Sequence, residues 1–206
     1  MESFAWFVAG HRLRDESCGL ESVVRNHGDR LVCYGLNPRS TILSGPGGRL
    51  RCARDADISL CQNLLLDLDL VGTVTPERLA SLKRFLSRAD EYFLGLGLCR
   101  PVRAATGRGS HLLFGFPPIP VADVPDVRAR CRLFRDGFAS AVRSELSRLE
   151  VRLDSTQDLR RAVRVYGTAK PGVGVVSQFV GGARHEDSAL RSYLLGLACC
   201  TESVVK

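Results

Sequence analysis

The sequence predicts a mixed α/β (α+β) domain, and two observations carry this prediction. Segments in which apolar residues recur every three or four positions alternate along the chain with short, strongly apolar runs. The chain has 206 residues, of which 45% are hydrophobic and 25% charged, as in ordinary globular proteins. Helices and strands that alternate in a chain of this length indicate one domain with a shared core.

The N-terminal part is expected to hold a short helix at 16–26 and a strand at 30–36. A loop rich in Gly, Pro and Arg follows at 37–51. We expect the domain to divide near residue 60, into an N-terminal α/β lobe, 1–60, and a larger lobe, 61–206.

Two longer helices are predicted from the spacing of apolar residues. The first, about 75–96, begins at the capping residue Thr75 and continues with Pro76, a favoured first helical residue. The second is expected at 123–149. Their apolar positions, spaced by three or four, are Leu79, Leu82, Leu86, Ala89, Phe93 and Leu96 in the first and Val127, Cys131, Phe134, Phe138, Val142 and Leu146 in the second.

Strands are expected between and after these helices. Their apolar runs lie at 62–68, 101–105, 110–116 and 162–166. A loop rich in proline is expected at 116–125.

Several classes of protein are excluded by simple features of the chain. No apolar run approaches the roughly 18 residues that span a bilayer. The N-terminus lacks a positive charge ahead of its short apolar stretch, so it is not predicted to be a signal peptide. We therefore expect a cytoplasmic protein with no membrane partner. The eight cysteines are scattered without a Cys-x-x-Cys pair, so no zinc is expected and they are interpreted as small buried hydrophobes.

Arginine dominates the basic residues, with 26 arginines against three lysines and a net charge of +7. Arginine pairs bidentately with phosphate and stacks on bases, so this excess suits a nucleic-acid partner. Codon usage in an arginine-rich host would give the same count. The composition by itself therefore names no function.

The first motif is a pair of aspartates, Asp67 and Asp69, that ends an apolar run. Alternation along a strand directs both side chains to one face. Two carboxylates held close together repel unless a cation lies between them, and Mg²⁺ or Mn²⁺ suits oxygen ligands. An isolated Asp-x-Asp that merely ends a strand and faces solvent is the alternative.

The second motif is Thr106-Gly107-Arg108-Gly109-Ser110-His111, at the start of the strand at 110–116. Its glycines allow close approach of the backbone to a ligand, and Arg108 and His111 could bind a triphosphate. Many hairpins use the same glycines for positive φ, and a lone histidine before a strand is commonly structural.

The third motif runs from Asp154 to Lys170. Asp154 follows an apolar pair and could supply a third carboxylate. Arg164 and Lys170 flank a Gly-Thr turn, so two cations could converge on phosphates. The alternative is a solvated basic face beside a turn.

The order of the three motifs resembles the archaeo-eukaryotic primase superfamily, over roughly residues 30–175. The pattern is Asp-x-Asp, then Thr-Gly-x-Gly-x-His, then Asp followed by Arg-x-x-Gly-Thr-x-Lys. It is most similar to the primase-polymerase (prim-pol) domains of plasmids, phages and CRISPR-associated or helicase-fused proteins. Two positions depart mildly from the family: Tyr166 stands where proline is common, and Thr106 where serine is common.

The resemblance implies a fold and a set of roles. The fold is an RRM-like catalytic sheet, antiparallel or mixed, with flanking helices, beside the N-terminal lobe; residues 1–206 would be a single prim-pol domain of a longer protein. Two Mg²⁺ or Mn²⁺ ions would bind Asp67, Asp69 and Asp154. The residues implied to bind the nucleotide are Arg108, Ser110, His111, Arg164, Thr168 and Lys170.

The implied activity is template-dependent nucleotidyl transfer by a DNA primase or polymerase. Its partners would be a single-stranded DNA template, a primer, a dNTP or NTP, and a fused or associated helicase or CRISPR or mobile-element protein. The lack of a zinc set favours primer extension over de novo priming. Two other classes stay open: a non-catalytic single-strand-binding module, and a metal-dependent nuclease, since carboxylate clusters also cut phosphodiesters.

Overall fold

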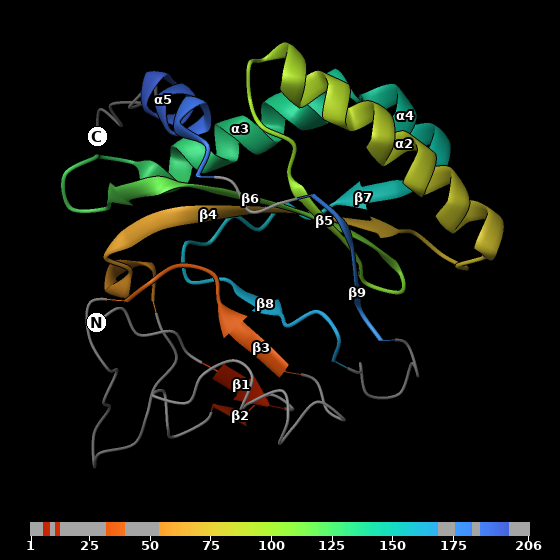
Figure 1. Ribbon diagram of the computed structural model, residues 1–206, viewed down its shortest axis with the longest axis horizontal. Coiled ribbons are helices and arrows are strands. Elements are labelled where there is room, and N and C mark those ends of the chain that lie inside the picture. The colour runs from red at the N-terminus through yellow and green to blue at the C-terminus, as the bar shows by residue number, and fades with distance from the viewer. Residues whose placement is uncertain are drawn as a thin grey trace, which may run out of the picture.

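The computed structural model shows two antiparallel sheets and a layer of helices (Figure 1). It describes residues 6–8, 11–12, 32–39, 54–168, 176–182 and 186–197. The mixed α+β class expected from the sequence is confirmed. The helix expected at 16–26 and Lys170 lie outside the described residues. Within the described part, no helix is both long and apolar enough to cross a membrane.

The larger sheet has five strands in the order β7-β4-β6-β5-β9. Figure 1 shows all four described α-helices on one face of it. The strands are β4 (Leu60–Leu70), β5 (Val102–Ala105), β6 (Gly109–Pro120), β7 (Val151–Leu153) and β9 (Gln178–Gly181). The helices are α2 (Pro76–Gly95), α3 (Val127–Ala141), α4 (Arg143–Leu149) and α5 (Ser188–Gly196).

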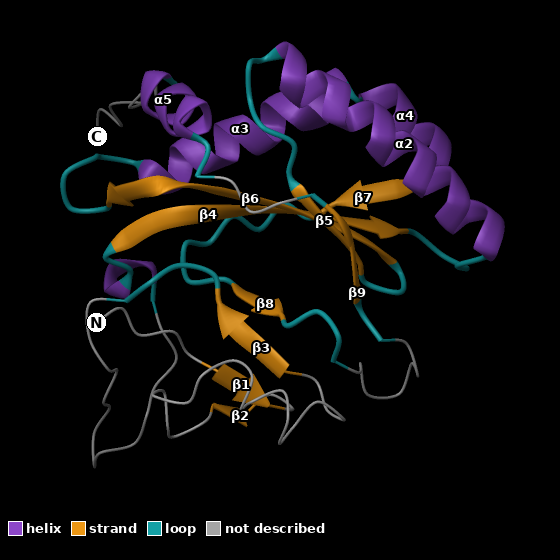
Figure 2. Cartoon of the chain, viewed as in Figure 1, coloured by secondary structure: helices purple, strands orange, loops and turns teal. Residues whose placement is uncertain are grey.

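The smaller sheet lies on the other side of the larger one (Figure 2) and has the order β2-β1-β3-β8. Its strands are β1 (Trp6–Val8), β2 (His11–Arg12), β3 (Val32–Gly35) and β8 (Ala162–Arg164). Strand β8 pairs antiparallel with β3, so the smaller sheet also contains a strand from beyond residue 60. The division into lobes 1–60 and 61–206 stays a prediction, and β8 crosses it.

The helix predicted to begin at Thr75 forms as α2. The Thr75 hydroxyl oxygen accepts a hydrogen bond from the Arg78 backbone N–H at 3.3 Å, which caps the helix. The middle of its apolar stripe is buried, whereas Leu96 at the end is exposed. Phe93 stacks with Phe138 of α3 and meets Phe114 of β6 edge-on.

The helix expected at 123–149 is divided in the structure, so that prediction was wrong in extent. Val142 has a non-helical φ of −112° and ψ of 18°, and it separates α3 from α4. Val142 and Leu146 stay in the core despite the break. The apolar spacing therefore predicted the buried face correctly, because burial does not require the helix to be continuous.

Strand β6 continues through Pro117 and Pro118, where the sequence predicts a loop. Two features of the ladder accommodate these prolines, which cannot donate hydrogen bonds. The pairing with β4 shifts register between Cys61 and Asn63, and the pairing with β5 ends at Leu113. A bulge and a strand edge thus lie where backbone donors are missing.

Asn37 ties the smaller sheet to the larger one. This residue follows β3 and is buried. Its side-chain oxygen accepts hydrogen bonds from the backbone N–H groups of Gln62 and Asn63, at 2.9 and 3.0 Å. Its amide nitrogen donates to the Leu159 carbonyl at 3.1 Å. One side chain therefore connects β3, the start of β4 and the segment before β8.

Candidate functional site

Strand β4 presents different residues on its two faces. Leu64 and Leu66 belong to the core under the helices, whereas Leu65 packs in a separate cluster with residues of the smaller sheet. Asp67 and Asp69 have the same parity as Leu65. Both carboxylates therefore lie on the face that looks toward the smaller sheet, which we call the inter-sheet face.

His111 lies directly across from Asp67 in the register of β4 and β6. Its Nε2 is 3.4 Å from Asp67 Oδ1, and its Nδ1 is 3.0 Å from the hydroxyl oxygen of Tyr166. The imidazole is thus held between a carboxylate and a phenol. When the phenol donates to Nδ1, the ring keeps its proton on Nε2, facing Asp67.

The charge on Asp67 is stabilised although the residue is largely buried. Burial alone would raise the pKa of Asp67, but the hydrogen bond and charge of His111, together with the charge of Arg161, hold this pKa below its ordinary value. Burial, with Tyr34 and Asp67 nearby, raises the pKa of Tyr166 far above its usual range. Tyr166 is therefore a neutral hydrogen-bonding group at physiological pH.

Arg161 bridges the first and third motifs. A single guanidinium nitrogen, Nη2, donates to Asp67 Oδ2 and to Asp154 Oδ2, at 2.9 Å each. The other terminal nitrogen donates to the Thr156 carbonyl at 2.7 Å. Asp154 is anchored to β4 by its backbone N–H, which donates to the Asp67 carbonyl at 2.9 Å. Two aspartates 87 residues apart in the chain thus converge on one cationic atom.

The carboxyl group of Asp154 is also held in its charged form. Burial tends to raise the pKa of Asp154, whereas the Thr156 backbone N–H, which donates to Oδ1 at 2.9 Å, and the Arg161 charge bring the pKa below its ordinary value. Hydrogen bonds to a carboxylate favour its ionised state.

Asp69 lies on the inter-sheet face, but it is not gathered with Asp67 and Asp154 into one group of metal ligands. Its register partners are Gly109 on β6 and Arg152 on β7. Among the described residues, no group of three or more His, Cys, Asp or Glu side chains is gathered closely enough to hold a metal ion. The convergence that the structure does show is between Asp67 and Asp154, with Arg161 between them.

The glycine-rich loop is a tight hairpin that joins β5 to β6. Gly107 has a φ of +90°, which favours glycine. A Cβ on Gly109 would lie 1.8 Å from the Leu68 carbonyl oxygen, so only glycine allows β6 to approach β4 there. Exposed Arg108 lies at the hairpin tip, and its guanidinium donates to the Gly72 carbonyl at 3.4 Å.

Ser110 lies on the other face of the sheet. It pairs with Leu68 in the register, so both side chains lie on the face of the sheet that the helices cover. It lines a cavity of about 480 Å³ next to α2, together with Leu82 and Leu86. Ser110 therefore lies on the opposite face of the sheet from His111, and its role at the triphosphate stays a prediction.

Arg164 and Thr106 meet below the hairpin. Arg164 Nη1 donates to the Thr106 carbonyl at 3.2 Å. Arg164 Nε and the Thr106 hydroxyl are both buried without a hydrogen-bond partner. Such atoms are costly unless a ligand or water satisfies them. Thr168 is completely buried, and its hydroxyl donates to the Val165 carbonyl at 2.7 Å, which gives it a role in the turn.

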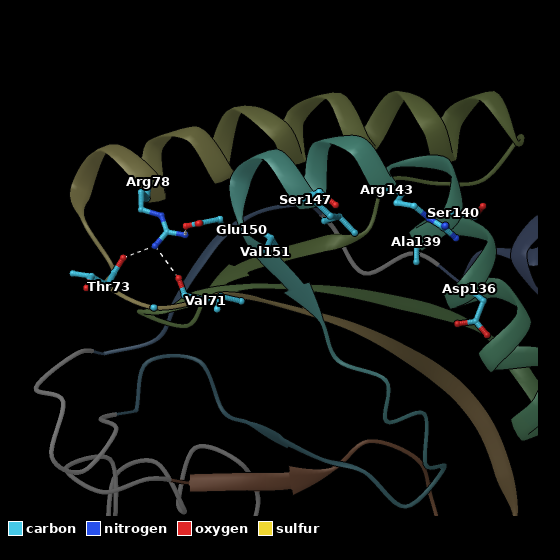
Figure 3. Close-up of a pocket in the computed structure, with 12 residues that line it drawn as sticks. Val71, Thr73, Arg78, Asp136, Ala139, Ser140, Arg143, Ser147, Glu150 and Val151 are labelled. Carbon is cyan, nitrogen blue, oxygen red and sulfur yellow. Dashed lines mark hydrogen bonds and ion pairs between the residues drawn. The ribbon is translucent and has the colours of Figure 1, made fainter.

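A groove of about 850 Å³ lies away from these residues, between α2, α4 and the segment after β4 (Figure 3). Arg78 lies at one end of this groove (Figure 3). The guanidinium donates to the carbonyls of Val71 and Thr73, at 2.8 and 2.5 Å, and pairs with Glu150 at 2.9 Å. Because these partners occupy Arg78, we assign it to holding the segment in place.

Arg161 and Tyr166 were not predicted from the sequence as residues of the site. Arg161 belongs to a run of basic residues for which a solvated surface was the alternative interpretation. No spacing rule relates an arginine in a loop to an aspartate in a strand 94 positions earlier. The available signal was the pair of carboxylates itself, which requires a nearby cation.

The carboxylate oxygens of Asp67 and Asp154 are ligands of the kind that suits a hard divalent cation. Two carboxylate oxygens, each 2.9 Å from one nitrogen, already surround a single positively charged position. Mg²⁺ and Mn²⁺ prefer such oxygen ligands. Beside this position, His111 offers a ring nitrogen that can donate a hydrogen bond to an anionic oxygen.

Comparison with known proteins finds likeness in structure alone. No family model matches the chain and no curated protein matches its sequence. The polymerase domain of Mycobacterium tuberculosis ligase D, solved in complex with DNA, is similar with a TM-score of 0.51 and 15% identity, over 94% of this chain and 69% of that one. The AEP domain of the cyanophage S-2L primase-polymerase gives a TM-score of 0.49 and 15% identity, over 92% and 86%. The chain thus shares its fold with that ligase D polymerase domain.

Proposed function

We propose that this protein is a template-dependent nucleotidyltransferase, a DNA primase or polymerase that extends a strand on single-stranded DNA. One observation carries the proposal. Asp67 and Asp154 converge on a single cationic position beside His111, in a fold shared with a DNA-bound polymerase domain. Paired carboxylates next to hydrogen-bond donors are what metal-assisted transfer to a phosphorus centre requires.

The metal site in this proposal consists of Asp67 and Asp154, with Asp69 on the same strand face. Bound there, Mg²⁺ or Mn²⁺ would lower the pKa of the attacking 3′-hydroxyl and neutralise charge on the triphosphate. The chain's own contribution is to hold the two carboxylates close together around Arg161. It also keeps them charged, as the lowered pKa values of Asp67 and Asp154 indicate.

The triphosphate site in this proposal lies beside the carboxylates. His111 would donate a hydrogen bond from Nε2 to a phosphate oxygen, and Arg164 and Thr106 would use their unpartnered buried atoms in the same way. These donors sit on or beside strands, so they can be oriented before the nucleotide binds. Arg108, Thr168 and Lys170 complete the proposed set, on the resemblance in sequence.

The test is primer extension with a labelled strand. Single-stranded DNA, with and without an annealed primer, is incubated with dNTPs or NTPs and with Mg²⁺ or Mn²⁺, and the products are sized. We expect lengthened products that require the metal. Shortened products would identify a nuclease, and unchanged DNA that is still bound would identify a single-strand-binding module; either result overturns the proposal.

The variant Asp67→Asn sharpens this test because it keeps the size of the side chain and removes its charge. We expect extension to fall by at least about a hundredfold, or 2.7 kcal/mol of transition-state stabilisation. The matched control is Asp136→Asn, at an exposed aspartate of α3 whose partner is the neighbouring Arg135. This control should extend primers like the wild type.

A further inference from the structure

The position between Asp67 and Asp154 is taken by Arg161, which donates from one nitrogen to both carboxylates at 2.9 Å. We propose that Arg161 is a built-in cation that holds these carboxylates together before the metal binds, and that it is released to the nucleotide when the metal arrives. The proposal rests on the proposed function. It defines the ligand of the site as a complex of a divalent cation with a nucleoside triphosphate, in preference to the free cation.

Arg161 and a divalent cation compete for the same carboxylate oxygens. A guanidinium and a divalent cation both require the Oδ2 atoms of Asp67 and Asp154, and two cations this close repel each other. The metal can enter this position only if the Arg161 side chain leaves. Its departure gives up two charge-assisted hydrogen bonds, which opposes binding of the free metal ion.

The anchoring of Arg161 determines where its side chain can go. Its backbone N–H donates to the Asp158 carbonyl at 3.1 Å, and its carbonyl accepts from the Leu36 N–H at 2.8 Å. The side chain is only 15% exposed. The released guanidinium therefore stays near the carboxylates, where it needs a new anionic partner.

A nucleoside triphosphate supplies that partner. Its phosphate oxygens can accept hydrogen bonds from the released guanidinium, as arginine and phosphate commonly pair. The metal and the nucleotide then assist each other's binding through Arg161. Such a coupling is reciprocal, because each ligand must change the affinity of the other by the same factor.

The experiment measures metal and nucleotide binding separately in Arg161→Gln. Free Mn²⁺ is counted by electron paramagnetic resonance without nucleotide, and a fluorescent non-hydrolysable triphosphate analogue is titrated at saturating Mn²⁺. We expect Mn²⁺ alone to bind at least about tenfold tighter than to the wild type, and the analogue to bind roughly tenfold more weakly. A merely structural arginine would not move the two affinities in opposite directions.

Two further variants control this result. Arg160→Gln changes the adjacent arginine, whose side chain is 48% exposed and lies 3.8 Å from Asp158, and both affinities should match the wild type. Arg161→Lys keeps a positive charge, so its Mn²⁺ affinity should stay within about threefold of the wild type. Arg161→Lys also tests the proposal if Arg161→Gln does not fold. If the lysine variant bound Mn²⁺ tenfold tighter than the wild type, the positive charge at position 161 would not compete with the metal, and the proposal would be wrong.

Unchanged Mn²⁺ affinity in folded Arg161→Gln would overturn this inference alone, since primer extension is measured independently. Failure of the proposed function would look different. In that case the wild type would not extend a primer, whatever the Mn²⁺ affinities of the wild type and its variants.

Discussion

His111 and Arg161 show what residue type alone can and cannot predict. Asp67 and His111 stand at the ends of two apolar strands, so each could be proposed as functional from its position in the sequence. Their contact at 3.4 Å depends on the register between β4 and β6, which no local pattern encodes. Arg161 reaches Asp67 from an irregular segment, and for such segments there is no periodicity to interpret.

Replacing His111 by alanine should separate binding from stability. If this imidazole donates to the triphosphate, the KM for the nucleotide should rise by roughly 10- to 150-fold, which corresponds to one charge-assisted hydrogen bond of about 1.5 to 3 kcal/mol. The Tm should also fall, because Tyr166 and Asp67 both lose a partner. Nucleotide KM and Tm are measured on the same preparation.

Tyr166→Phe is the control for this substitution, because it removes the phenol that contacts His111 Nδ1 and leaves the imidazole in place. It should lower the Tm while changing the nucleotide KM by less than about threefold. A His111→Ala protein with lowered Tm and normal KM would remove His111 from the triphosphate site.

The lowered pKa values of Asp67 and Asp154 predict how stability depends on pH. A carboxyl group whose pKa is lower in the folded state than in the unfolded chain, where it is near 3.8, binds fewer protons when folded. Stability from these groups is present above the unfolded pKa and is lost as the pH falls through the folded one. The free energy of unfolding should therefore decrease from roughly pH 5 to pH 3.

Urea unfolding across this pH range measures the effect, and Arg161→Gln tests its cause. Without Arg161 the folded pKa values of Asp67 and Asp154 rise toward their ordinary value, so this part of the pH dependence should become shallower. An equally steep dependence in the variant would mean that other carboxylates are responsible.

At the scale of elements, the β5–β6 hairpin shows how a weak sequence signal becomes a strict structural requirement. Gly109 brings β6 so close to β4 that an added Cβ would lie 1.8 Å from the Leu68 carbonyl oxygen. Gly109→Ala should therefore destabilise the protein by about 1–3 kcal/mol, the usual cost of overpacking. Thermal and urea unfolding measure the change.

Gly95→Ala is the matched control for Gly109→Ala. Gly95 is the last residue of α2, and nothing lies within 4 Å of an added Cβ. Because alanine favours helices, this variant should be at least as stable as the wild type. Equal Tm values for the two variants would show that the hairpin moves to accept the methyl group.

Asn37 connects three elements and gives a second prediction at this scale. Asn37→Ala leaves the buried N–H groups of Gln62 and Asn63 without their acceptor, at a cost of about 1–3 kcal/mol for each unpaired group. Asn37→Asp keeps that acceptor and loses the donor to Leu159, so it should destabilise the protein less. Urea unfolding of both variants would contradict this account if their order of stability were reversed.

The elements were predictable where apolar spacing is long and regular. The helix beginning at Thr75 and the strands at 62–68, 101–105 and 110–116 form close to their expected bounds. The break at Val142 was not predictable, because both halves keep their apolar stripe. Strands β7 and β9 were missed because three or four residues at a sheet edge carry too little periodicity to detect.

At the scale of the whole molecule, the arginines of the segments that the structure describes fall into two groups. Arg128, Arg161 and Arg164 make internal ion pairs or hydrogen bonds and are partly buried. The exposed ones include several on the helices and two beside Asp69: Arg152, its register partner on β7, and Arg108, at the hairpin tip next to Gly109. The arginine count alone could not separate internal from external charges, because the distinction depends on the fold.

The exposed Arg152 beside Asp69 indicates where a single-stranded template would pass. If single-stranded DNA passes beside Asp69, one of its phosphates meets Arg152, and the condensed counterion is released. The affinity for a fluorescent oligonucleotide should then fall as salt increases, and Arg152→Gln should reduce the log–log slope by about 0.7. Arg88→Gln, at an exposed position of α2 on the helix side of the sheet, should leave the slope unchanged. A slope that changes with Arg88 but not with Arg152 would place the strand on the helical layer, away from the carboxylates, and would contradict the proposed path of the template.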